Sequence, residues 1–123
     1  MLKLLLDEHI SPDVAEWFRG RHDKRVVLSL TEWEEGRFLG QADELLLKEA
    51  AAQKLTLVTY DRKTIPPLLK AWAEADRVHG GVVFVDNKTI PSSDFGGLIR
   101  ALQKLFQEAA KWDWTNRICF LRR

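Results

Sequence analysis

Acidic side chains recur directly after the apolar segments of this sequence. Asp7 and Glu8 follow the Leu-rich residues 2–6, Asp61 follows LTLVTY, and Asp86 ends VVFVD. If these segments are parallel strands, their carboxyl ends meet at one edge of a sheet, where open α/β sheets bind ligands. We therefore expect these side chains to gather at one site.

Two further acids, Asp43 and Glu44, begin the helical segment DELLLKEA. Carboxylates that converge in one concavity raise one another's pKa values unless a cation neutralises them. Oxygen ligands favour Mg²⁺ or Mn²⁺ over zinc, which usually recruits Cys or His, and such ions commonly serve phosphate chemistry. The acids thus predict a Mg²⁺ or Mn²⁺ site, with His9 beside it as a substrate contact or proton carrier.

Each of these residues also has a purely structural interpretation. Asp43 suits the positive end of a helix dipole, Asp61 a turn or cap before a Pro-containing helix, and Asp86 an Asp-Asn turn. His9 would then be a solvent-exposed loop residue. Because acids follow three of the four main apolar strands, a shared site is favoured over separate structural roles.

The composition predicts one domain spanning residues 1–123 and gives no global case for a polyanionic partner. Hydrophobic residues make up 46% of the chain, which suffices for one sizeable core, and the net charge is only +1. Cys119 is the only cysteine, so no intrachain disulfide is expected. With no membrane-spanning run and no secretory signal in the sequence, we expect a cytoplasmic protein.

Segments of strand and helix character alternate along the chain. The pattern predicts strands at residues 2–6, 25–30, 55–60, 82–86 and 117–121, and helices at 12–20, 42–54, 67–75 and 94–110. Ser11 would cap the first helix, Ser92 or Ser93 the last, and the final strand would lie at a sheet edge. This order predicts an α/β fold, a three-layer α/β/α domain with a mostly parallel central sheet.

Four stretches of the sequence resemble the PIN-like family, in particular the small bacterial PIN-like, toxin-type proteins. They are LLLDEHISP, ADELLLKEA, LTLVTYDRKT and GVVFVD, in this order through nearly the whole chain. The resemblance implies a PIN-like domain with Mg²⁺- or Mn²⁺-dependent ribonuclease activity. Many members of the family are toxins that a small antitoxin protein holds inactive, and many are dimers, for which Trp33, Trp112 and Trp114 would suit a shared face.

The resemblance also implies roles for individual residues. Asp7, Asp43 and Asp61 match the family's catalytic metal ligands, with Glu44 as the alternative to Asp43. Glu8 would be an additional ligand or would support the ligands.

The family motif after the third strand often continues Thr-x-Asp-x-Asp-Phe. Here Lys63 stands in place of the second Asp and Thr64 in place of the aromatic residue. Lys63, Arg62 and His9 would then contact the RNA backbone, while Asp86 or Asp94 is left as the source of a further acid.

Two other functions remain open. Replacement of an acid by Lys63 removes a metal ligand, and this favours a catalytically silent PIN-like binding or regulatory module. A phosphoacceptor receiver domain would also carry acids after the first and third strands. That class needs a fifth strand that ends in Lys and is followed by a helix, whereas this sequence ends in RICFLRR.

Overall fold

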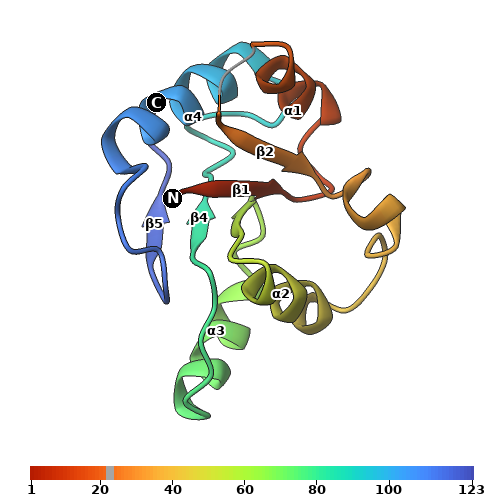
Figure 1. Cartoon of the computed structure of the whole chain (residues 1–123), viewed down its shortest axis with the longest axis vertical. Coiled ribbons are helices and arrows are strands. Elements are labelled where there is room, and N and C mark those ends of the chain that lie inside the picture. The colour runs from red at the N-terminus through yellow and green to blue at the C-terminus, as the bar shows by residue number, and fades with distance from the viewer. Residues whose placement is uncertain (22–23) are drawn as a thin grey trace.

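The computed structural model, which describes residues 1–21 and 24–123, contains one five-stranded, all-parallel sheet with the order β2-β1-β3-β4-β5 (Figure 1). The strands are β1 (Lys3–Leu6), β2 (Val26–Ser29), β3 (Thr56–Thr59), β4 (Val82–Phe84) and β5 (Ile118–Phe120). The helices are α1 (Pro12–Arg19), α2 (Asp43–Ala52), α3 (Ile65–Glu74) and α4 (Phe95–Ala109), with a 3-10 turn η1 (Trp33–Gly36). The predicted α/β fold is confirmed, and its sheet is wholly parallel.

Two apolar cores form the layers above and below the sheet. Helices α1 and α4 cover one face of the sheet and α2 and α3 cover the other (Figure 1). Leu4 and Leu6 belong to the first core and Leu5 to the second, and all three are fully buried. This alternation explains why residues 2–6 are continuously apolar, since a central parallel strand is covered on both faces. The three-layer arrangement predicted from the sequence is therefore present.

Local sequence determines where the helices begin. Ser11 caps α1 by accepting a hydrogen bond from the Asp13 amide at 3.2 Å, as expected. Pro66 and Pro67 lie in the first turn of α3, where a missing amide proton is tolerated.

The cap predicted for α4 was wrong. Asp94, rather than Ser92 or Ser93, accepts a hydrogen bond from the Gly97 amide, because an N-cap must stand directly before the first helical residue.

The proposed aromatic dimer face is not present as predicted. Trp33 is buried and stacks on Phe38, and Trp114 is buried with its indole N–H donated to the Ala109 carbonyl at 2.9 Å. Only Trp112 of the three is exposed, at 44%. Trp33 and Trp114 therefore belong to the two hydrophobic cores.

Within residues 1–21 and 24–123, no helix has the length and apolar character needed to cross a membrane.

Candidate functional site

Asp7 lies at the carboxyl end of β1 with both carboxylate oxygens in hydrogen bonds. Its Oδ1 accepts from the Glu8 amide at 2.7 Å, and its Oδ2 accepts from the Thr59 hydroxyl at 2.6 Å. Thr59 is fully buried at the end of β3, the strand next to β1. The neighbouring strand thus fixes the direction in which the Asp7 carboxylate points.

Asp61 lies two residues beyond β3 and is linked to Asp7 through the same threonine. Its backbone amide donates to Thr59 Oγ1 at 3.0 Å, and its Oδ1 accepts from the Lys63 and Thr64 amides at 2.8 and 2.9 Å. Burial alone would raise the pKa of Asp61, but these hydrogen bonds, that of the Thr64 hydroxyl and the charge of nearby His9 outweigh burial and lower the pKa. Asp61 is therefore an ionised, oriented carboxylate at neutral pH.

Asp43, the first residue of α2, reaches the same place from a different element. The Thr64 hydroxyl lies 2.8 Å from Asp43 Oδ2 and also contacts Asp61 Oδ2. Two carboxylates that share one hydroxyl are no more than two hydrogen-bond lengths, about 6 Å, apart. The structure therefore places the Asp43 and Asp61 carboxylates close together at Thr64, whereas Asp7 is connected through Thr59 to the backbone amide of Asp61 and not to its carboxylate.

The Thr64 hydroxyl contacts two carboxylates but can donate to only one of them at a time, because it carries a single proton. Both contacts are exposed, so water can satisfy the carboxylate that the hydroxyl does not serve. A cation shared by Asp43 and Asp61 would in addition relieve the repulsion between the two carboxylates.

The remaining residues of the predicted site lie around this cluster. Glu8 and His9 are exposed in the loop after β1, and His9 is close enough to lower the pKa of Asp61. Lys63 is exposed and contributes its backbone amide to Asp61. The Arg62 guanidinium lies over the Phe120 ring, 5.4 Å from its centroid. Glu44 does not join the acids, because it pairs with Arg77 at 2.9 Å.

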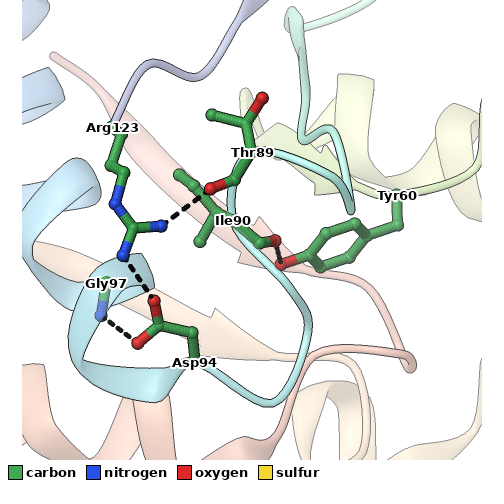
Figure 2. Close-up of polar contacts among 6 residues, drawn as sticks. All are labelled: Tyr60, Thr89, Ile90, Asp94, Gly97 and Arg123. Carbon is green, nitrogen blue, oxygen red and sulfur yellow. Dashed lines mark hydrogen bonds and ion pairs between the residues drawn. The ribbon is translucent and has the colours of Figure 1, made fainter.

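Both candidates for a further acid have hydrogen-bond partners outside the cluster. Asp86 Oδ1 accepts from the Lys88 amide at 3.0 Å, as in the Asp-Asn turn that the sequence left open. Asp94 caps α4 through Gly97 and binds Arg123 at 3.1 Å, as Figure 2 shows.

These contacts order the segment between β4 and α4. Arg123 also donates to the Thr89 carbonyl at 2.7 Å, and the Tyr60 hydroxyl donates to the Ile90 carbonyl at 2.7 Å (Figure 2). Burial, together with the charge of Asp94, raises the pKa of Tyr60 to about 12, so the phenol stays protonated and keeps donating. Tyr60 and Asp94 therefore hold the loop beside the rim.

The three-acid cluster fits a hard divalent cation by donor type. Its ligands would be carboxylate oxygens alone, which suit Mg²⁺ or Mn²⁺, and a cation between Asp43 and Asp61 would relieve the repulsion between these two carboxylates. In the part of the chain that the structure describes, no three Asp, Glu, His or Cys side chains stand ready as a metal cage. A cation would therefore require the Thr64 hydroxyl to turn away from between the carboxylates.

The two bridging threonines carry roles that the sequence did not assign. Thr59 belongs to the Thr-x-Asp motif, and Thr64 stands three residues after Asp61 at the start of α3. The spacing Thr-x-Asp-x-x-Thr is the signal that could have revealed both, because an Asp before a helix commonly accepts from amides two and three residues ahead.

The fold and the site define an α/β protein with a parallel five-stranded sheet and an acidic, threonine-bridged carboxyl rim. No family model matches this chain, and neither a curated protein nor a solved structure matches it. The class of protein therefore follows from the fold alone, and the PIN-like resemblance stays a prediction.

Proposed function

We propose that this protein is a Mg²⁺- or Mn²⁺-dependent ribonuclease that hydrolyses RNA phosphodiesters, with Asp7, Asp43 and Asp61 as the metal ligands. One observation carries the proposal: the Thr64 hydroxyl joins carboxylates from α2 and from the loop after β3. A purely structural cap on α3 would need Asp61 alone. A second carboxylate at the same hydroxyl adds like-charge repulsion, which a bound cation would relieve.

The reaction is attack by water on phosphorus, in line with the bond to the 3′-oxygen. A phosphorus–oxygen bond forms to water while the bond to the 3′-oxygen breaks, water loses one proton, and the leaving oxygen gains one. A bound Mg²⁺ or Mn²⁺ would supply the lowered pKa of the attacking water and the stabilisation of the charged phosphate.

The protein's own contribution is orientation and charge. Thr59 fixes the Asp7 carboxylate, and two backbone amides fix Asp61. Glu8, exposed beside Asp7, supports the ligand set. The exposed cations Arg62 and Lys63 would hold the RNA phosphates next to the reacting group, with His9 as a further contact.

The PIN-like resemblance extends this proposal to partners. A toxin of this kind would be held inactive by an antitoxin protein that covers the acidic rim, and a homodimer would follow the habit of the family. The exposed Trp112 is the part of the predicted aromatic face that remains available for such contacts.

A catalytically silent binding or regulatory module is the second candidate. It is favoured by Lys63, whose ammonium replaces the acid that the family motif carries, and by the engagement of Asp86 and Asp94 elsewhere. A site with three acids binds a divalent ion more weakly than one with four, because each carboxylate adds both charge and a ligand.

The receiver-like alternative shares the sheet order β2-β1-β3-β4-β5, which is common to doubly wound folds. A phosphoacceptor carboxylate needs an oxygen free to attack phosphorus. Asp61 Oδ1 accepts from two amides and Oδ2 contacts Thr64, so this geometry disfavours the receiver.

The test is cleavage of single-stranded RNA at low salt with Mn²⁺ added, using protein freed of host nucleases. We expect cleavage by the unaltered chain and its loss in Asp7→Asn and Asp61→Asn. Asp76→Asn is the matched control, because Asp76 is an exposed turn residue with a left-handed backbone (φ 57°) that Asn also tolerates.

Metal binding is measured separately, by calorimetric titration with MnCl₂. Binding without cleavage would support the silent module, and absence of both would contradict the metal site itself. Cleavage that persists in both Asn variants would assign the activity to a contaminant. Labelling of Asp61 by acetyl phosphate would favour the receiver.

A further inference from the structure

β5 is one of the two edge strands of the sheet, the other being β2. In the described part of the chain β5 pairs with β4 alone. The Arg117 carbonyl accepts from the Val82 amide, and the Leu121 amide donates to the Phe84 carbonyl, so these residues turn their backbone groups toward β4. Because successive residues of a strand point their backbone groups to opposite sides, those of Ile118 and Phe120 face outward. These outward-facing amide and carbonyl groups have no strand partner in the described residues and can pair with an added strand.

The helical layers cover this strand only in part, because Cys119 packs against the core on the α4 side while the side chains of Ile118 and Phe120 stay exposed. Side chains of β4 are at most 3% exposed, whereas Ile118 is 49% and Phe120 57% exposed. The opposite edge strand β2 alternates buried and half-buried residues. An exposed apolar edge strand is a usual site for strand addition, and natural proteins normally protect it.

Hollows flank β5 on both faces of the sheet. The hollow on the α3 side has a volume of about 700 Å³, and apolar side chains of Leu69, Val78, Phe84, Ile118 and Phe120 line much of it. The hollow on the α4 side, about 440 Å³, is lined by Lys104, Glu108, Cys119 and Arg122 among others. Because side chains of an added strand alternate between the two faces, one set would enter each hollow.

The charged side chains around β5 favour a negatively charged partner. Lys104 and Arg122 outnumber Glu108 in the α4-side hollow, and Lys70 and Arg77 outnumber Asp76 in the α3-side one. Arg117 and Arg122 flank β5 at its two ends. A second copy of β5 would bring these arginines together with those of its partner, whereas an acidic segment would neutralise them.

We propose that the open edge of β5 binds an extended segment of another protein in which apolar residues alternate with acidic residues. The apolar side chains fill the α3-side hollow beside Ile118 and Phe120, and the acidic ones face Lys104 and Arg122. The backbone of the segment pairs with the outward-facing groups of Ile118 and Phe120. This surface meets the acidic rim at Phe120, over which Arg62 lies, but the proposed docking does not depend on any ribonuclease activity.

The probe is a short fluorescein-labelled peptide in which Val and Glu alternate, with binding followed by fluorescence anisotropy on the full chain. Two control peptides have the same Val and Glu content in paired order, or Lys in place of Glu. We expect the alternating acidic peptide to bind at least about tenfold more tightly than either, because only it satisfies both hollows. Added salt should weaken this binding.

Variants locate the peptide on the protein. Ile118→Lys should weaken binding by about tenfold or more, since it removes a central apolar contact. Leu45→Lys is its matched control, because Leu45 on α2 is also 49% exposed, and it should bind as the unaltered chain does. Should Ile118→Lys fail to fold, Lys104→Glu with Arg122→Glu alters only exposed charges and should reverse the preference toward the Lys peptide.

Three outcomes would overturn the proposal. One is binding that ignores the order or charge of the peptide. Another is equal loss of binding in Ile118→Lys and Leu45→Lys. The third is self-association in sedimentation that Ile118→Lys abolishes, which would assign the edge to a second copy of this chain.

Discussion

Replacing Thr59 by Val tests whether the carboxyl rim is organised as the structure indicates. The exchange keeps the branched shape of a fully buried side chain and deletes its hydroxyl. Asp7 Oδ2 then loses a donor at 2.6 Å, and the Asp61 amide loses an acceptor at 3.0 Å. A hydrogen bond to a charged group contributes about 1.5–3 kcal/mol, and an unpaired buried amide costs about 1–3 kcal/mol.

Water reaches the half-buried Asp7 and Asp61 and offsets part of this loss. We therefore expect Thr59→Val to lower the free energy of unfolding by about 3 kcal/mol. For a domain of this size each kcal/mol shifts the unfolding temperature by about 4 °C, so the total shift should be about 12 °C. Urea denaturation and thermal unfolding measure the two quantities.

Thr56→Val is the matched control on the same strand. Thr56 is 1% exposed, and its hydroxyl donates to the Gly80 carbonyl at 2.7 Å, at the amino end of β3. This neutral hydrogen bond contributes about 1 kcal/mol, so the unfolding temperature should fall by about 4 °C. The two variants therefore separate the loss of a buried hydroxyl from the loss of order at the rim.

The same pair tests the proposed metal site. Thr59→Val frees the Asp7 carboxylate to rotate and should weaken Mn²⁺ binding about 10–100-fold, as expected when a group that orients a ligand is removed. Thr56→Val should leave Mn²⁺ binding unchanged. Equal stability losses and equal Mn²⁺ affinities in the two variants would refute the reasoning, because Thr59 would then have no special connection to the acids.

Three further predictions concern the scaffold. Burial lowers the pKa of His79, whose Nδ1 accepts from the Gly81 amide at 3.0 Å. The neutral imidazole should therefore contribute stability that is fully present above the ordinary pKa of 6.5 and is lost as pH falls below 6.5. Urea midpoints measured above and below pH 6.5 should show this loss in the unaltered chain and not in His79→Gln. Asp94→Ala should lower the urea midpoint in the same denaturation assay, through loss of the α4 cap. Gly81→Ala should lower the free energy of unfolding by about 3 kcal/mol or more, because φ is +101° and a Cβ would lie 2.7 Å from the Trp114 carbonyl oxygen. Gly40→Ala is its control: φ is +73° there, but the space is open, so the loss should be only about 1–2 kcal/mol.

Periodicity and composition were sufficient to predict the order of strands and helices. Residues 2–6 and 55–60 are apolar because parallel strands are covered on both faces, and the predicted ends lie within two residues of β1 and β3. The alternation of elements predicted a mostly parallel sheet, and the sheet is wholly parallel. What pattern could not predict was burial of Trp33 and Trp114, because a scattered aromatic residue shows no period that distinguishes core from surface.

The sequence was sufficient to predict which acids form the candidate site, but not the hydrogen bonds that connect them. Strand ends gather at one rim by topology, so Asp7 and Asp61 could be paired from sequence alone. The hydroxyl bridges depend on side-chain directions and on how α2 meets the start of α3, which only the folded chain determines. The choice of Asp94 as a cap, and hence its absence from the acid cluster, depends on a one-residue difference in where α4 begins.

Lys63 and Thr64 differ from the PIN-like motif that the sequence resembles, and both contact Asp61. Lys63 uses its backbone amide to hold Asp61, a role that any residue except Pro can fill, and its exposed ammonium remains available to an anionic ligand. Thr64, at the place of the motif's aromatic residue, is the specific choice, because its hydroxyl alone connects Asp43 to Asp61. Loss of an acid alone would not explain the hydrogen bonds of Thr64 that connect the Asp43 and Asp61 carboxylates. Under the proposed function, Lys63 and Thr64 in place of the motif's acid and aromatic residue would make a rearranged site, with one carboxylate fewer and one cation more than the motif has.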